Sequence, residues 1–256
     1  MSLDLKQLLR VAKKAALAAG VEILTIYESG DFSIEAKSDD SPLTLADKAA
    51  HRKIVSFLEE TGMPILSEEG RDIPFEERSE WEYFWMVDPL DGTKEFIKRN
   101  GEFTVNIALI HKGKSILGVV YPPVIGEMYW ALDGQGSFRE RNGEVAQINT
   151  TKKSLNESGL KVVASRSHMS AETEGYIAKF ENPEIVSKGS SLKFLLVASG
   201  EADVYPRFGP TMEWDTAAAH VIVTEAGGRV VLDDETTPLE YNKENLLNPY
   251  FLVLPS

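Results

Sequence analysis

The sequence contains no cysteine, and only four of its 256 residues are histidine. Disulfides, thiolate nucleophiles and cysteine-ligated zinc or iron–sulfur centres are therefore excluded. Basic residues are also scarce, because 27 Lys and Arg stand against 40 Asp and Glu and give a formal net charge of −13. Binding to a nucleic-acid polymer depends on clustered Lys and Arg, so this charge argues against such a partner. A small phosphorylated ligand remains compatible with the charge if bound metal ions reverse it locally.

Long hydrophobic runs are absent as well. No apolar run approaches the roughly 18 residues that a membrane-spanning helix requires, and the first residues lack the charged-then-apolar pattern of a signal peptide. We therefore expect a soluble cytoplasmic protein, with at most a peripheral contact at the inner membrane. The sequence leaves open whether the protein is a monomer or a homodimer.

The composition is that of a globular protein, with 43% hydrophobic and 26% charged residues. Apolar spacing predicts helices over residues 3–28 and 44–60, followed by strands at 64–66 and 83–87 and an antiparallel meander between 102 and 131. From about residue 160 the pattern changes to alternating strands (161–165, 184–187, 202–205, 229–232 and 250–254) and helices (170–180, 190–199 and 214–226). We predict a mixed α+β and α/β fold with two subdomains in one structural domain. Residues 1–155 form the antiparallel-sheet subdomain, and residues 156–256 form the α/β subdomain.

The most specific motif follows the apolar strand at 83–87 and reads Asp88-Pro89-Leu90-Asp91-Gly92-Thr93. Pro89 holds Asp88 in extended geometry, and Asp91 can turn back towards it. Two carboxylates about 4 Å apart repel by about 4 kcal/mol at an effective dielectric constant of about 20, so the pair needs a shared proton, a basic partner or a cation. Thr93 opens a helix whose free N–H groups suit a phosphate, and hard oxygen ligands beside it favour Mg²⁺. The alternative is a turn with no further role, because Asp-Pro and Asp-Gly are common turn formers.

Three other acidic segments are ambiguous when each is taken alone. Glu68, in Ser67-Glu68-Glu69-Gly70, follows an apolar strand and could lie beside Asp88, or it could belong to a solvated acidic loop. Asp215 opens a helix and could be only its N-cap. Asp47 stands at the acidic position of a capping box that begins at Thr44.

Taken together, these segments resemble the inositol monophosphatase superfamily over nearly the whole chain. The resemblance rests on residues 88–96, on Glu68-Glu69 and on Trp214-Asp215, with further similarity at 41–47, 97–104, 165–168, 189–194 and 205–211. Within the superfamily, Lys94-Glu95-Phe96 and residues 189–193 are most similar to the 3′(2′),5′-bisphosphate nucleotidases of the bacterial CysQ type. The resemblance implies a layered αβαβα sandwich.

The resemblance also implies the roles of individual residues. Two or three Mg²⁺ ions would be held by Glu68, Asp88, the Leu90 carbonyl, Asp91 and Asp215. Catalytic roles would fall to Asp47, Thr93 and Glu68, with Asp47 hydrogen-bonded to Thr93, and Thr93 together with a metal ion activating the attacking water. The substrate would contact Glu68, Leu90, Asp91, Gly92, Thr93, His168, Ser190, Lys193, Arg207 and Asp215.

Two cations among these residues bear on the nature of the substrate. Lys193 and Arg207 suit a second phosphate remote from the metal ions, and Arg207 can clamp it with two hydrogen bonds. The alternatives are that Lys193 lies on a solvated face and that His168 caps the following helix.

The activity that the resemblance implies is that of a Mg²⁺-dependent, lithium-sensitive phosphomonoesterase. It would remove the 3′-phosphate of adenosine 3′,5′-bisphosphate to give AMP and phosphate, and would also act on 3′-phosphoadenosine 5′-phosphosulfate. One alternative is an inositol or sugar monophosphatase, whose substrate has no second phosphate for Lys193 and Arg207. Another is a non-catalytic metal- or nucleotide-binding regulator, which would have no use for the Asp47–Thr93 pair.

Overall fold

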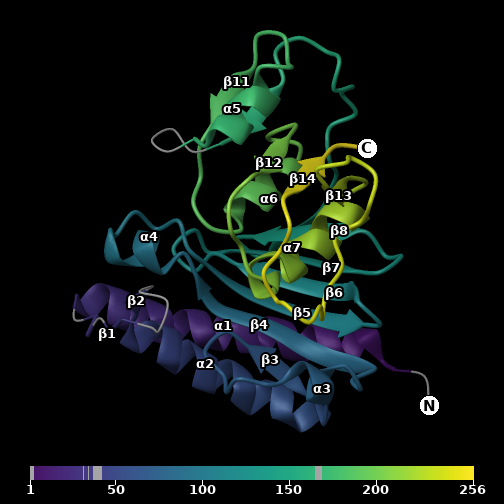
Figure 1. Cartoon of the computed structure of the whole chain (residues 1–256). Coiled ribbons are helices and arrows are strands. Elements are labelled where there is room, and N and C mark those ends of the chain that lie inside the picture. The colour runs from purple at the N-terminus through teal and green to yellow at the C-terminus, as the bar shows by residue number, and fades with distance from the viewer. Residues whose placement is uncertain (1–2, 31, 34, 37–41, 165–168) are drawn as a thin grey trace.

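A computed structural model describes residues 3–30, 32–33, 35–36, 42–164 and 169–256 of the chain (Figure 1). Its centre is a seven-stranded sheet in the order β3-β4-β5-β6-β7-β8-β9. The strands are β3 (Ile65–Ser67), β4 (Tyr83–Asp91), β5 (Thr104–His111), β6 (Lys114–Tyr121), β7 (Glu127–Leu132), β8 (Ser137–Arg141) and β9 (Glu144–Ile148). β3 runs parallel to β4, and from β4 onwards all neighbours are antiparallel. The predicted meander is confirmed and continues further than expected into β8 and β9.

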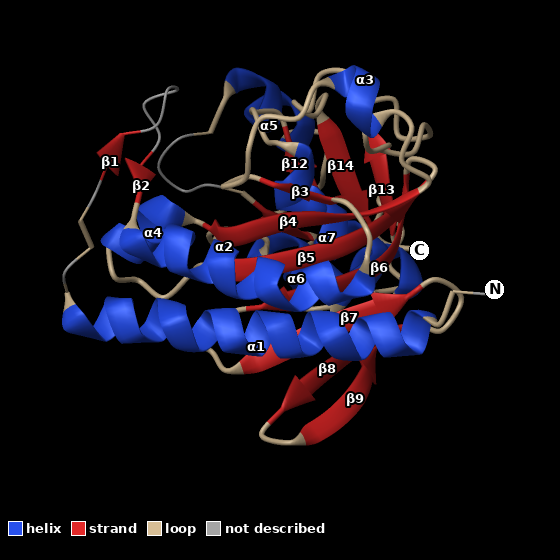
Figure 2. Ribbon diagram, turned by 90° about the horizontal axis from the view of Figure 1, so that it is seen from below, coloured by secondary structure: helices blue, strands red, loops and turns tan. Residues whose placement is uncertain are grey.

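Two long helices cover one face of this sheet, as Figure 2 shows. They are α1 (Leu5–Ser29), capped by the Asp4 side chain, and α2 (Leu45–Leu58), which continues as the 3₁₀ turn η1 (Glu59–Thr61). Both confirm the predicted helices. The alanines on the buried face of α1 allow close packing, and the shared apolar layer reaches Trp85 of β4. The chain also forms a short antiparallel ladder of β1 (Glu35–Ala36) and β2 (Pro42–Leu43) before α2, and a short helix, α3 (Phe75–Arg78), whose Arg78 donates to residues 242–244.

The opposite face of the sheet carries α6 (Leu192–Ala198) and α7 (Glu213–Glu225). Helix α7 crosses β4 to β7, and its backbone comes very close to β6 at Gly118. A Cβ atom added at Gly118 would lie 2.1 Å from the carbonyl oxygen of Ala218. This glycine therefore sets the distance between the helix and the sheet.

A second, smaller sheet lies beyond these helices and completes the layers (Figure 1). It has the order β12-β14-β13, formed by β12 (Tyr205–Arg207), β14 (Phe251–Leu254) and β13 (Arg229–Leu232). The parallel pair β10 (Lys161–Val163) and β11 (Glu184–Val186) joins it through a bridge between Val162 and Val204, and α5 (Ala171–Ile177) packs on its outer side. The order of layers is helix, sheet, helix, sheet, helix, which confirms the predicted αβαβα sandwich.

The structure corrects one predicted strand. Residues 202–205 were expected to be extended, whereas β12 occupies Tyr205–Arg207. The cause is Asp203, a buried carboxylate that accepts hydrogen bonds from Thr151, Lys153 and the Lys161 N–H and so holds the chain in a turn before the strand. Among the described residues, no helix is both long enough and apolar enough to cross a membrane.

Candidate metal and phosphate site

Three carboxylates from distant parts of the chain meet at one edge of the central sheet. Glu68 follows β3, and its N–H donates to the Val87 carbonyl of β4 at 3.1 Å, so the parallel pairing sets it beside Asp88. Asp215 arrives from the first turn of α7. Each of the three residues offers an oxygen, and these oxygens lie within 4.8 Å of one another. The structure thus brings together the predicted ligands Glu68, Asp88 and Asp215.

The electrostatics of this cluster suit a cation. Burial raises the pKa of Asp88 well above its usual range, and the charges of Glu68, Asp91 and Asp215 raise it further. Burial and then the charge of Asp91 also raise the pKa of Asp215. Several buried carboxylates can stay ionised side by side only if a positive charge offsets their repulsion. Converging carboxylate oxygens are hard ligands, so the residues fit a divalent cation such as Mg²⁺.

The last residues of β4, after Asp88, have an irregular backbone around Leu90. Asp88 Oδ1 accepts a hydrogen bond from the Leu90 N–H at 3.0 Å, and the register with β5 shifts between Asp88 and Asp91. The Leu90 carbonyl oxygen lies 3.3 Å from the Thr93 hydroxyl oxygen, which also has Asp47 Oδ1 at 3.2 Å, so the single hydroxyl hydrogen serves one of these two acceptors at a time. Leu90 is thus tied to Asp88 through its N–H and lies beside Thr93 through its carbonyl, and the role of that carbonyl as a metal ligand stays a prediction.

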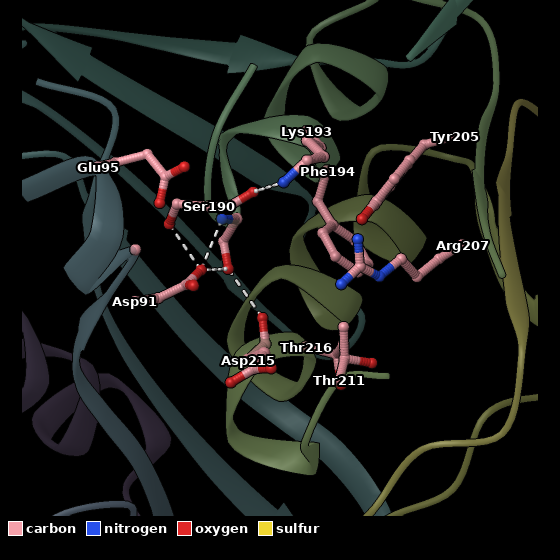
Figure 3. Close-up of a pocket in the computed structure, with 12 residues that line it drawn as sticks. Asp91, Glu95, Ser190, Lys193, Phe194, Tyr205, Arg207, Thr211, Asp215 and Thr216 are labelled. Atoms are coloured by element: carbon pink, nitrogen blue, oxygen red, sulfur yellow. Dashed lines mark hydrogen bonds between the residues drawn. The ribbon is translucent and has the colours of Figure 1, made fainter. Parts of the chain in front are cut away.

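Asp91 is held by a segment that comes 100 residues later in the chain, as Figure 3 shows. Its Oδ2 accepts from the Ser190 hydroxyl at 2.6 Å and from the N–H and hydroxyl of Ser191, both at 2.7 Å. The Nδ2 of Asn106 lies 3.5 Å from the same oxygen. Among the described residues, none of these bonds reaches Oδ1. The Ser190 side chain therefore faces Asp91, although Ser190 also lines the cavity described below.

The predicted pair of Asp47 and Thr93 is formed. Asp47 is 2% exposed, and its Oδ2 accepts from the backbone N–H of Thr44 at 2.8 Å and from the Thr44 hydroxyl at 2.5 Å, which completes the expected capping box of α2. Its other oxygen accepts from the Thr93 hydroxyl at 3.2 Å. One carboxylate thus caps a helix and orients a hydroxyl at the site.

Gly92 and Thr93 form the corner between β4 and the short helix α4 (Thr93–Ile97). Gly92 has φ 96°, a conformation that favours glycine. A Cβ atom there would lie 3.1 Å from the Glu102 carbonyl oxygen and 3.3 Å from Ser190 Cβ. Both the positive φ angle and the lack of space for a Cβ atom therefore disfavour any residue other than glycine at this corner.

A cavity of about 260 Å³ opens beside the carboxylates. In Figure 3, Asp91, Glu95 and Asp215 lie on one side of it, and Lys193 and Arg207 lie on the other. The Lys193 ammonium donates to the Ser190 carbonyl at 3.0 Å, and Arg207 donates to the Pro210 carbonyl at 2.8 Å. The predicted cations therefore face the acidic wall across the cavity.

A second cavity, of about 360 Å³, adjoins the first. The two share Lys193, Tyr205 and Arg207, and the second is walled by the apolar side chains of Met169 and Phe208 among others. The predicted contact His168 lies outside the described residues.

Sequence reasoning missed several polar residues around Asp91, namely Thr104, Asn106 and Ser191. Thr104 and Asn106 are buried polar residues in the otherwise apolar strand β5. Polar residues within an apolar strand could have been noticed in the sequence, because a buried polar side chain needs a hydrogen-bond partner. Ser191 stood inside a recognised motif but had no assigned role.

The family model described as "Inositol monophosphatase family" matches residues 4–249. A protein from Escherichia coli K12 named "3'(2'),5'-bisphosphate nucleotidase CysQ" is 48% identical over 242 residues, which cover 92% of this chain and 94% of the relative. A Salmonella typhimurium protein of the same name is 46% identical over 256 residues, covering 97% and 98%.

Solved structures agree with these matches. The crystal structure of CysQ from Bacteroides thetaiotaomicron superimposes with a TM-score of 0.88 at 47% identity and covers 99% of both chains. An inositol monophosphatase from Anabaena superimposes with a TM-score of 0.76 at 26% identity, covering 98% of this chain and 92% of the other.

Proposed function

Because the chain belongs to the inositol monophosphatase family, whose members depend on metal ions, we propose that it is a Mg²⁺-dependent 3′(2′),5′-bisphosphate nucleotidase. The reaction is hydrolysis of the 3′-phosphate of adenosine 3′,5′-bisphosphate to AMP and phosphate. The sulfated analogue 3′-phosphoadenosine 5′-phosphosulfate is a second substrate. The names of relatives 46–48% identical over almost their whole length support this choice.

The observation that carries the proposal is the division of one cavity into a carboxylate wall and a wall with two cations. A substrate with phosphates at both ends of a ribose matches this arrangement. The reacting phosphate lies at the metal ligands, and the remote phosphate lies at Lys193 and Arg207. A guanidinium and an ammonium give charge-assisted hydrogen bonds to phosphate oxygens.

The residues that would hold two or three Mg²⁺ ions are Glu68, Asp88, the Leu90 carbonyl, Asp91 and Asp215. When bound, Mg²⁺ supplies a Lewis acid that polarises the phosphate and lowers the pKa of water. The protein fixes the ligands in advance, since Asp88, Asp91 and Asp215 are each anchored through one oxygen by a hydrogen bond from the chain itself. Among the described residues, the second oxygens of Asp91 and Asp215 accept no hydrogen bond from the chain and would be available to the cations.

Thr93 is the proton acceptor for the attacking water in this proposal. When its hydroxyl hydrogen points to Asp47 Oδ1 rather than to the Leu90 carbonyl, the hydroxyl oxygen can receive a proton as its own moves along that hydrogen bond. Glu68 accepts a hydrogen bond from the same water and orients it. The backbone N–H groups of Gly92 and Thr93 hold the phosphate, where negative charge develops.

The nucleoside occupies the second cavity, whose apolar walls suit a base and whose shared Lys193 and Arg207 link it to the first. His168 stays a predicted contact to this part of the substrate. Ser190 contributes to the wall of the first cavity, while its hydroxyl donates a hydrogen bond to Asp91.

The test is a phosphate-release panel at one Mg²⁺ concentration with adenosine 3′,5′-bisphosphate, inositol monophosphate and fructose bisphosphate. We expect the nucleotide to give the highest kcat/KM. Equal or higher values for inositol monophosphate would instead make the protein a monophosphatase of the same family. Release from none of the three substrates would leave a binding protein.

Lys193→Ala sharpens this comparison. It should raise KM for the bisphosphate nucleotide about 10-fold or more, the effect of one lost charge-assisted hydrogen bond. KM for inositol monophosphate should stay close to that of the unmodified enzyme. Lys112→Ala is the matched control, because Lys112 is an exposed lysine whose described ion pair is with Glu82 in a turn of the sheet. Equal losses on both substrates after Lys193→Ala would contradict the second phosphate site.

A further inference from the structure

The hydrogen bonds around Asp91 form a compact group, here called the Asp91 clamp and consisting of Asn106, Ser190 and Ser191. These three residues offer four donor groups to Oδ2, which come from β5 and from the segment before α6. A carboxylate oxygen that accepts several hydrogen bonds is fixed in orientation, and so is the other oxygen of the same group. The clamp therefore determines which way Oδ1 of Asp91 points.

Ser191 also connects two predicted metal ligands. It is 2% exposed, and its hydroxyl oxygen lies 2.7 Å from Asp91 Oδ2 and 2.8 Å from the backbone carbonyl oxygen of Asp215. One hydroxyl hydrogen serves only one of these acceptors at a time, whereas the Ser191 N–H holds Asp91 in either case. A single residue thus ties the ligand on β4 to the ligand on α7.

Asn106 in turn orients Ser191. It is 1% exposed, its Nδ2 donates to the Ser191 hydroxyl oxygen at 2.9 Å, and its Oδ1 accepts from the Thr104 hydroxyl at 3.0 Å. The donation from Asn106 occupies a lone pair of the Ser191 oxygen, so the Ser191 hydrogen must point to Asp91 or Asp215. A buried side-chain amide lowers stability little when its donor and its acceptor are both hydrogen-bonded. Removing one partner leaves a buried polar group unsatisfied and lowers stability much more.

We propose that Ser191 and Asn106 are positioning residues that set the geometry of the divalent-cation site by clamping Asp91 and Asp215 together. The proposal rests on the proposed function only in taking Mg²⁺ as the cation. Hydrogen bonds to metal-ligating side chains orient them, and their loss typically costs 10–100-fold in metal affinity. The proposal gives a role to the buried polar side chains of Asn106 and Ser191, which are not among the predicted substrate contacts.

The test measures Mg²⁺ binding by isothermal titration calorimetry on the full chain without nucleotide. Ser191→Ala should weaken binding about 10-fold or more, and Ser191→Thr, which keeps the hydroxyl, should restore most of it. Ser199→Ala is the matched control, because the Ser199 hydroxyl, at the C-terminal end of α6, donates to the Leu195 carbonyl. Ser191→Ala with unchanged Mg²⁺ affinity would overturn the proposal.

Two further readouts separate positioning from a general loss of structure. Asn106→Ser removes the amide donor and should also weaken Mg²⁺ binding, with a kcat that recovers at saturating Mg²⁺. In the unmodified protein, the NMR signals of the Ser191 amide and of the Asn106 side-chain amide should shift with the same Mg²⁺ midpoint that calorimetry gives. Signals that do not respond to Mg²⁺ would overturn the clamp even if the variants failed to fold. Because no nucleotide is present, an error in the nucleotidase assignment would leave these outcomes unaffected.

Discussion

Single carboxylates carry the chemistry at this site, and Asp88 is the most constrained of them. It is almost completely buried, and the surrounding charges of Glu68, Asp91 and Asp215 oppose its ionisation. Such a residue destabilises the protein without a cation and becomes favourable only with one. Neutralising Asp88 is therefore expected to impair function without lowering the stability of the metal-free protein.

The substitution Asp88→Asn tests this expectation. Phosphate release should fall at least about 100-fold, a loss typical of removing a group that stabilises transition-state charge. The melting temperature in the presence of a chelator should be unchanged or higher, since a repulsive charge has been removed, and added Mg²⁺ should no longer raise it. Phosphate-release assays and thermal melting measure both effects. Full activity in this variant would refute the assignment of Asp88 as a ligand.

Thr93 is expected to act on turnover rather than on binding. Thr93→Ala should lower kcat by about 10²-fold to 10⁴-fold, the usual contribution of a positioned proton acceptor, while KM changes only a few-fold. Thr93→Ser should keep much of the activity, because its hydroxyl can reach Asp47 in the same way. Steady-state kinetics decide the matter, and a variant with normal kcat and raised KM would contradict the role in water activation.

His220 in α7 is expected to control stability in mildly acidic solution. Burial lowers the pKa of His220 to about 4, and its Nδ1 lies 2.8 Å from the Tyr241 hydroxyl. As the pH falls from about 6.5 towards 4, the unfolded chain binds a proton at this residue and the folded chain does not, so stability is lost over that window. The full loss is about 3 kcal/mol. It is absent above pH 7, where both states are neutral.

The measurement is urea unfolding at pH 7, 6, 5 and 4 for the unmodified protein and for His220→Gln, which retains a partner for Tyr241. The free energy of unfolding should fall more steeply in the unmodified protein over this range. Parallel curves for the two proteins would contradict the buried neutral histidine.

Helices and strands could be predicted where the local sequence alone determines their type and position. The apolar spacing of α1 and the capping box of α2 were sufficient to place these helices, whereas the apolar run at 83–87 placed only the first part of β4, which continues through a shift in register to Asp91. Strands β8 and β9 were missed because β8 consists mostly of charged residues and β9 is exposed except at Ile148, so neither shows a buried apolar alternation. The start of β12 was misplaced because tertiary hydrogen bonds to Asp203 decide it.

The close contact between β6 and α7 should make position 118 intolerant of any side chain larger than that of glycine. Gly118→Ala should destabilise the protein by about 3 kcal/mol or more, because the added methyl group meets the Ala218 carbonyl oxygen in a packed layer. Gly175→Ala on α5 is the control, since nothing lies within 4 Å of the added atom. That change should stabilise the helix by up to about 1 kcal/mol. Chemical denaturation of both variants measures the difference, and equal stabilities would contradict the close packing.

The functional site belongs to the whole molecule, because its parts come from β3, β4, α2, α6 and α7. Local sequence identified the kinds of residue and their motifs, and the resemblance to a family joined them into one site. The polar residues of β5 indicated that buried partners exist, but the sequence could not identify Ser191 as the partner of Asn106, since the two meet only through the packing of β5 against the segment before α6. The division into residues 1–155 and 156–256, the cellular location and the oligomeric state stay predictions.

One measurement tests most directly whether distant carboxylates share divalent cations. Crystals grown with Mn²⁺ in place of Mg²⁺ allow the ions to be located by anomalous diffraction. We expect peaks within coordination distance of Glu68, Asp88 and Asp215, with Oδ1 rather than Oδ2 of Asp91 facing a metal ion. A map with no ordered ion among these carboxylates at saturating Mn²⁺ would contradict the account.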